Sequence, residues 1–127
     1  MKYLIDSYAW IEYLDGTECG EKIKEFFSEE NEIFSIPLVL AEVIGRTKRK
    51  EMDIDTAFKA IVSSSIILNI DAETSKEAGI LHAEMKKTIR DFGLTDAFIL
   101  AMARKLKAKI VTGDEHFRKI KEAILIR

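Results

Sequence analysis

Short runs rich in β-branched residues alternate along the chain with longer segments of helical periodicity, and this alternation limits the possible folds more than any other feature. Most of the short runs are continuously apolar, which is the pattern of strands that are covered on both faces. Strands that are separated by helices form parallel sheets. The sequence therefore predicts a three-layer α/β sandwich. The predicted strands are Lys2–Asp6, Ile33–Ile36, Ile66–Ile70, Lys109–Thr112 and Ile124–Ile126.

The segments between these runs are predicted to be helical. Pro37, the only proline, lies where a proline can open a helix. Asp71 and Thr95 precede helical patterns and are predicted to be N-caps. No linker or internal repeat divides the chain, so residues 1–127 are expected to form one domain. The predicted helices are Ser7–Leu14, Cys19–Ser28, Leu38–Arg49, Ile54–Val62, Glu73–Asp91, Asp96–Lys107 and Glu115–Ile120.

Composition narrows the class of protein. With 47% hydrophobic and 33% charged residues, the 127-residue chain is neither disordered nor a membrane protein, and its N-terminal apolar stretch ends at Asp6, too early for a signal peptide. A net charge of −2 lacks the basic excess of domains that bind nucleic acid mainly through phosphate contacts. The single Cys19 excludes a disulfide framework and a multi-thiolate zinc site, and it favours a reducing, cytoplasmic setting.

Four acidic residues occupy positions at which parallel sheets carry their sites, beyond the carboxyl ends of the strands. Asp6 ends the first predicted strand, and Asp114 follows the fourth. Glu42 is the only charge in the apolar start of the helix after the second strand. Asp96 opens the helix that leads into the fourth strand.

Each of these acids has an ordinary structural explanation when it is taken singly. Asp6 and Asp114 can cap helices, Asp96 can favour a helix dipole, and Glu42 can pair with Arg46 one turn on. Together, four converging acids repel one another unless a cation lies among them. An all-oxygen site selects a hard ion such as Mg²⁺ or Mn²⁺, which activates water and stabilises charge at a phosphodiester. The residues therefore indicate a metal-dependent phosphodiesterase.

Four stretches of the sequence resemble the PIN-domain ribonucleases, and specifically the VapC-type toxins of toxin–antitoxin pairs. Their order and spacing extend over nearly the whole chain. The resemblance implies a five-stranded parallel sheet of order 3-2-1-4-5 and hydrolysis of RNA with Mg²⁺ or Mn²⁺. It also implies a homodimer and a cognate antitoxin that reaches into the acidic site. The stretches are Leu4–Trp10, Ala41–Val43, Thr95–Ala101 and Val111–Phe117.

The resemblance also implies roles for the acids, because Asp6, Glu42, Asp96 and Asp114 match the family's acidic quartet. The three aspartates are expected to hold the metal ion, directly or through water. Glu42 is expected to orient or deprotonate the attacking water, or to bind a second ion. Relatives often carry another acid where this chain has His116, which leaves a second metal site open.

Several further residues are candidates for contacts with substrate. The hydroxyls of Ser7 and Thr112 can orient carboxylates or contact phosphate, or they can simply be strand-end and capping residues. The basic end of the helix after the second strand can bind RNA phosphate or only solvate the helix. His116 is either a polar residue at a helix start or a substrate contact. The basic cluster consists of Arg46, Lys48, Arg49 and Lys50.

Two alternatives to a toxin remain at this point. A housekeeping RNA-processing nuclease of the same fold fits the same acids, and the RNA target cannot be read from the chain. A non-catalytic PIN-like or receiver-like binding module is disfavoured by the presence of all four acids. A receiver-like domain would also need a phosphoacceptor aspartate after the third strand, where Asp71 has the pattern of a helix cap.

Overall fold

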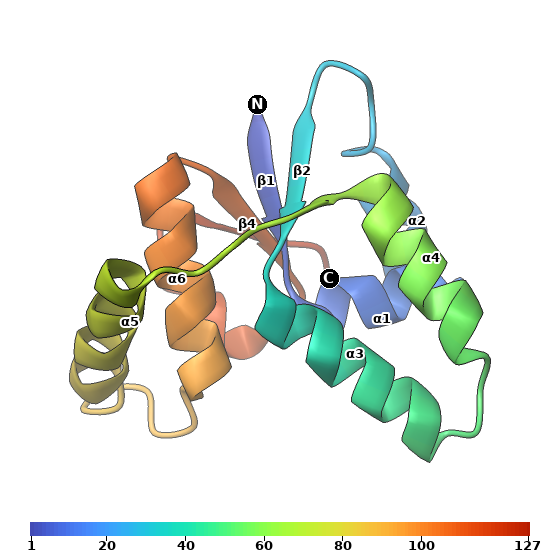
Figure 1. Ribbon diagram of the computed structural model, residues 1–127. Coiled ribbons are helices and arrows are strands. Elements are labelled where there is room, and N and C mark those ends of the chain that lie inside the picture. The colour runs from blue at the N-terminus through green and yellow to red at the C-terminus, as the bar shows by residue number, and fades with distance from the viewer.

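The computed structural model describes residues 1–127 and contains one five-stranded parallel sheet with helices packed on its two sides (Figure 1). The strand order is β3-β2-β1-β4-β5. Helices α1 to α4 pack together on one side, and α5 and α6 pack together on the other. This arrangement confirms the predicted three-layer sandwich and its strand order.

The elements follow one another in the expected alternation. The strands are β1 (Lys2–Ile5), β2 (Glu32–Ser35), β3 (Ile66–Ile67), β4 (Lys109–Thr112) and β5 (Ala123–Leu125). The helices are α1 (Ser7–Asp15), α2 (Glu18–Lys24), α3 (Pro37–Arg49), α4 (Ile54–Ser64), α5 (Ala72–Met85), α6 (Leu94–Leu106) and the short 3₁₀ helix η1 (Glu115–Phe117).

Several element ends differ from the prediction. The third strand is shorter than expected, because after Leu68 donates to the carbonyl of Ser35 the chain leaves the sheet edge toward α5. Helix α5 ends at Met85 instead of Asp91, since the next residues form tight turns that bring Phe92 into the core. The second predicted helix is likewise shorter at its end, and the last is reduced to η1.

Helix starts follow the side chains that can satisfy free backbone N–H groups. Asp71 is the predicted N-cap of α5, and its carboxylate accepts from the Thr74 amide at 2.8 Å. The prediction of Thr95 as an N-cap is wrong. Helix α6 begins two residues earlier than predicted, at Leu94, with Gly93 as its N-cap and the carboxylate of Asp96 bonded back to the Gly93 amide.

The central pair of strands positions the functional edge of the sheet. Strand β1 lies between β2 and β4, with Ile5 paired to Val111, so β1 and β4 end at the same level. Leu4, Ile5 and Val111 are fully buried between the two helical layers. Residue 6 and the residues after Thr112 therefore emerge side by side.

No helix combines the length and the apolar character that a membrane span requires.

Candidate metal centre

Asp6 and Thr112 meet where β1 and β4 end. Asp6 is only 3% exposed, and its Oδ1 accepts the Ala9 amide at 2.8 Å as the N-cap of α1. The buried Thr112 side chain forms a hydrogen bond with the Asp6 carboxylate. The same threonine oxygen accepts from the backbone amide of Asp114 at 2.9 Å. One hydroxyl thus links the first acid to the segment that carries the fourth.

Burial raises the pKa of Asp6 from 3.8 to about 7. The hydrogen bonds from Thr112 and Ala9 oppose this rise, while the negative charges of Asp114 and Asp96 add to it. Desolvation is the largest cause, because a buried carboxylate loses its hydration. A cation at this edge would favour the ionised carboxylate.

Asp96 approaches the same edge from the start of α6. Its Oδ2 accepts the Gly93 amide at 2.8 Å, so the helix N-terminus itself holds the carboxylate in place. Partial burial raises the pKa of Asp96 and the Gly93 bond lowers it. Of the neighbouring groups, Asp114 and Glu42 raise this pKa and His116 lowers it. Asp96 therefore interacts electrostatically with three other predicted site residues.

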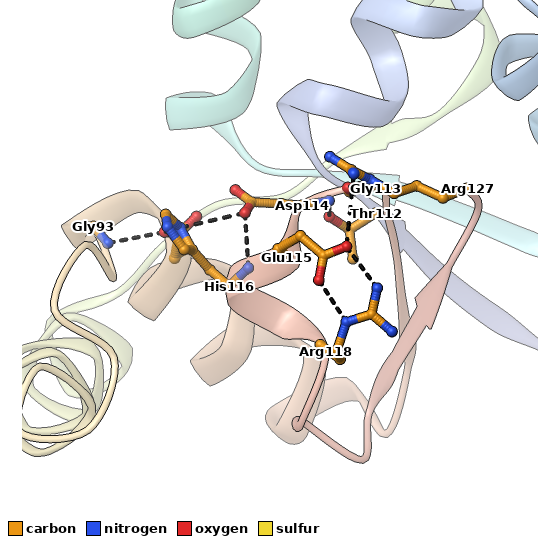
Figure 2. A network of polar contacts seen from close by, with 9 residues as sticks. Gly93, Thr112, Gly113, Asp114, Glu115, His116, Arg118 and Arg127 are labelled. Atoms are coloured by element: carbon orange, nitrogen blue, oxygen red, sulfur yellow. Dashed lines mark hydrogen bonds and ion pairs between the residues drawn. The ribbon is translucent and has the colours of Figure 1, made fainter.

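Asp114 and His116 complete a cluster with Asp96. The Oδ1 of Asp114 accepts the backbone amide of His116 at 2.9 Å, which makes Asp114 the N-cap of η1. The imidazole of His116 lies beside Asp114 on the side of Gly93 (Figure 2). Its Nδ1 lies 3.3 Å from Asp114 Oδ1 and 3.7 Å from Asp96 Oδ2. One possible ligand atom from each of Asp96, Asp114 and His116 lies within 4.8 Å of the other two.

Glu42 lies on α3 with an exposed side chain, outside the cluster of Asp96, Asp114 and His116. It lines a surface hollow of about 450 Å³ together with Ser7 and Arg49. Arg46 borders the same hollow, but it does not form the ion pair with Glu42 that the sequence suggested. Arg46 instead donates to Asp15 at the end of α1, with Nη2 2.9 Å from Oδ2. Lys48 and Lys50, the other members of the basic cluster, are exposed at the end of α3.

Tyr8, Gly113 and Arg127 support the site and were not predicted. A side chain at Gly113 would overlap the Tyr8 ring. The Nε of Arg127 donates to the Gly113 carbonyl at 2.6 Å (Figure 2). The Arg127 guanidinium also lies 5.7 Å from the centre of the Tyr8 ring. Gly113, which lies between the end of β4 and Asp114, was the one available sequence signal for this packing, because a glycine lets other groups pack closely against the backbone.

These residues fit a divalent cation. The Nδ1 of His116 is buried and has no hydrogen-bond partner, which is uncommon for a polar atom. The backbone amides use only one lone pair each of Asp96 Oδ2 and Asp114 Oδ1, so both carboxylates keep lone pairs that can bind an ion. Carboxylate oxygens suit Mg²⁺ or Mn²⁺, and such an ion would relieve the repulsion among the acids.

Comparison with known proteins identifies the family and the fold of the chain. The PIN domain model matches residues 3–123. Similar solved structures include a toxin–antitoxin complex from Klebsiella pneumoniae, at 22% identity over 98% of both chains and a TM-score of 0.78. VapBC2 from Rickettsia felis, bound to a DNA fragment from its promoter, is 22% identical over 98% of this chain and 97% of the other, with a TM-score of 0.75.

A third similar structure is VapC20 of Mycobacterium tuberculosis, described as a toxin that cleaves the sarcin–ricin loop. It is 15% identical over 94% of this chain and 95% of the other, with a TM-score of 0.74. A search of curated proteins finds no match. At these identities the structural likeness establishes a common fold.

Proposed function

Because this chain belongs to the PIN domain family, with the match extending over residues 3–123, we propose that it is an endoribonuclease that depends on Mg²⁺ or Mn²⁺. The observation that carries the proposal is the convergence of Asp6, Asp96 and Asp114 at the carboxyl edge of β1 and β4. All of residues 1–127 are proposed to form the one catalytic domain.

In this proposal Asp96 and Asp114 bind the ion, and Asp6 lies behind them as a direct or water-mediated ligand. When bound, the ion would stabilise charge on the scissile phosphate and lower the pKa of a coordinated water. The buried Thr112 cannot reach RNA, so its role is to orient Asp6 and the amide of Asp114. Asp6 must be ionised to contribute, and its raised pKa makes this dependent on the ion.

Glu42 is proposed to orient the attacking water and to accept its proton. It is exposed on α3 and its charge raises the pKa of Asp96, so it is near the acids without being buried among them. In the hydrolysis, water oxygen bonds to phosphorus and the bond to the 3′-oxygen breaks. The products are a 5′-phosphate and a 3′-hydroxyl, and the 3′-oxygen takes up a proton.

Substrate phosphates are proposed to enter along the hollow beside Glu42. Ser7 and Arg49 line this hollow and offer a hydroxyl and a cation. Arg46 also lines it, held in place by Asp15, so it can contact phosphate with little loss of side-chain entropy. With a net charge of −2, the protein would rely on the bound ion and these few cations for binding RNA.

We further propose that the enzyme is the toxin of a toxin–antitoxin pair, acting in the cytoplasm. Similar structures are of toxin–antitoxin complexes, which favours this role over RNA processing. A partner antitoxin would cover the acidic edge and compete with RNA for it. A homodimer is part of the proposal, and the exposed apolar residues Phe58 and Val62 of α4 offer a surface for it.

The nuclease proposal is tested with purified protein and a set of structured and unstructured RNAs in Mg²⁺, Mn²⁺ or EDTA. Cleavage is expected only with the ions, and the new 5′ ends should carry phosphate. Asp96→Asn and Asp114→Asn should abolish it. Asp91→Asn is the matched control, because Asp91 is an exposed acid just before the same helix. Cleavage in EDTA, or undiminished cleavage by both site variants, would overturn the proposal.

The toxin role is tested by inducing the chain in a bacterial host. Growth should stop with the wild-type protein and continue with Asp96→Asn. Co-expression of a small protein encoded directly upstream should restore growth and form a stable complex. Metal-dependent cleavage of one precursor RNA without growth arrest would indicate a processing nuclease instead.

A further inference from the structure

We propose that Nδ1 of His116 is a metal ligand and that this nitrogen makes the site prefer Mn²⁺ to Mg²⁺. The inference rests on the proposed metal-dependent function and deepens it, since it concerns the identity of the ion. His116 lies in η1, two residues after Asp114, and its imidazole ring turns back toward Asp114. The proposed third ligand is therefore a nitrogen atom and not a carboxylate oxygen.

The distances are those of neighbouring ligands around one ion. Nδ1 lies 3.3 Å from Asp114 Oδ1 and 3.7 Å from Asp96 Oδ2. Adjacent ligands of an octahedral ion with bonds of about 2.1 Å are about 3 Å apart. The three groups therefore need only a small adjustment to share an ion. The carboxylates of Asp96 and Asp114 alone could serve only to cap their helices, but Nδ1 of His116, which lies beside both, has no capping function.

The state of the Nδ1 atom supports the same conclusion. It is buried and has no hydrogen-bond partner, although two carboxylates lie close by. The ring therefore does not meet Asp114 in the geometry of a hydrogen bond. A buried nitrogen without a partner is unfavourable, and a coordinated cation would use its lone pair.

The surrounding backbone holds the ring at this place. The amide of His116 is bonded to Asp114 Oδ1, and the next residue, Phe117, is fully buried against Phe92 with ring centres 5.7 Å apart. His116 also borders a hollow of about 510 Å³ that is lined by Ile89 and Lys119 as well, and its side chain is 33% exposed. The imidazole thus has an anchored edge that faces the acids and an open edge that faces solvent.

A nitrogen ligand changes the preference among divalent ions. Mg²⁺ binds almost entirely through oxygen and gives up water reluctantly, whereas imidazole is a common ligand for transition metals. Carboxylates remain the majority of the ligands, which suits Mn²⁺ among those metals. Replacing the nitrogen should therefore weaken Mn²⁺ binding more than Mg²⁺ binding.

The test uses pulsed electron paramagnetic resonance of Mn²⁺ bound to the full-length protein. Wild-type protein should show coupling of the Mn²⁺ electron spin to a coordinated imidazole nitrogen. His116→Ala should lose that coupling, and its affinity for Mn²⁺ should fall about tenfold, or ~1.4 kcal/mol. Its affinity for Mg²⁺ should change less. His82→Ala removes the only other histidine, in α5, and should retain the wild-type spectrum.

His116→Asp provides a second variant with an oxygen ligand at the same position. It should bind both ions without nitrogen coupling and show a reduced preference for Mn²⁺. Circular dichroism checks that each variant is folded. The proposal is overturned if wild-type protein shows no nitrogen coupling, or if His116→Ala weakens both ions equally. Either result leaves the ribonuclease proposal intact, provided that cleavage still requires Asp96 and a divalent ion.

Discussion

The ring of Tyr8 fills the space that a side chain at position 113 would need: a Cβ placed on Gly113 would lie 2.1 Å from Cε1 of Tyr8. Tyr8 is two residues after Asp6, and Gly113 directly precedes Asp114. The packing of ring against backbone therefore sets how closely the first and fourth acids approach each other. Arg127 adds to it by bonding the Gly113 carbonyl from the C-terminal end of the chain.

Gly113→Ala should damage both the fold and the site, because either the Tyr8 ring or the segment that carries Asp114 must move. We expect unfolding free energy to fall by about 1–3 kcal/mol, the usual cost of overpacking, and RNA cleavage to fall by at least about tenfold, as displaced catalytic groups lose rate steeply. Urea unfolding and cleavage assays measure the two effects.

Gly79→Ala is the control for this variant. No atom lies within 4 Å of a Cβ at Gly79, which is inside α5, so the change should stabilise the helix by about 0.5–1 kcal/mol and leave activity unchanged. Wild-type cleavage by Gly113→Ala would contradict the role given to the contact with Tyr8.

The raised pKa of Asp6 has a consequence for stability. The folded protein holds this proton up to about pH 7, whereas the unfolded chain releases it near 3.8. Between these values the folded state binds more protons, so stability falls as pH rises through this window. Asp6→Asn removes the charge and should be more stable than wild type at pH 8, by ~4 kcal/mol at most, and similar to it near pH 4.

Thermal unfolding in EDTA from pH 4 to 8 measures this difference. The comparison between variant and wild type isolates Asp6 from other groups that titrate over the same range. If the Tm of wild type and the Tm of Asp6→Asn differ by the same amount at every pH from 4 to 8, Asp6 ionises normally. Adding Mn²⁺ at pH 8 should stabilise the wild-type protein much more than Asp6→Asn, because an ion that binds only the folded state raises its stability.

Glu42→Gln should separate catalysis from stability. The side chain is exposed on α3, so unfolding free energy should change by less than about 0.5 kcal/mol. Loss of a general base should lower kcat about 100-fold or more. Glu84→Gln, at an exposed position of α5, is the matched control. Full activity of Glu42→Gln would remove Glu42 from the mechanism, and a large loss of metal affinity would make it a ligand instead.

Ser35→Ala should affect the fold and spare the chemistry. The indole Nε1 of the buried Trp10 donates to Ser35 Oγ at 2.9 Å, and Ser65 lies at 2.9 Å from the same oxygen. Without the Ser35 hydroxyl, the buried indole N–H of Trp10 loses its hydrogen-bond partner, which should lower the free energy of unfolding by about 1–3 kcal/mol. Ser63→Ala, at an exposed hydroxyl, should cost little. Metal requirement and kcat should match wild type at temperatures where the protein is folded.

The sequence was sufficient for the order of the elements because strands covered on both faces leave continuous apolar runs that local patterns reveal. Helix ends were predicted less well. Helical periodicity continues past Met85, but the chain turns there and Phe92 packs beside Phe117 in the core, a long-range contact that local periodicity does not reveal. The start of α6 was missed because a backbone amide, that of Gly93, is capped by an acid three residues later.

The site was predictable to the extent that it depends on strand pairing. Once β1 and β4 are neighbours, Asp6 and Asp114 must emerge together. The partner of Arg46 was not predictable, because Asp15 lies 31 residues away on another helix. The direction of the His116 ring was equally inaccessible, since it depends on how the buried Phe117 orients a three-residue helix.

The insertion of β4 between β1 and β5 has a consequence for the chain while it is being synthesised. Asp6, Glu42 and Asp96 all precede β4, and they have no common edge until this strand pairs with β1. A growing polypeptide whose β4 segment has not yet left the ribosome thus contains three of the four acids but no assembled metal centre. If the chain is the proposed ribonuclease, such an incomplete chain should leave nearby RNA intact, including that of the ribosome producing it, until β4 has paired with β1.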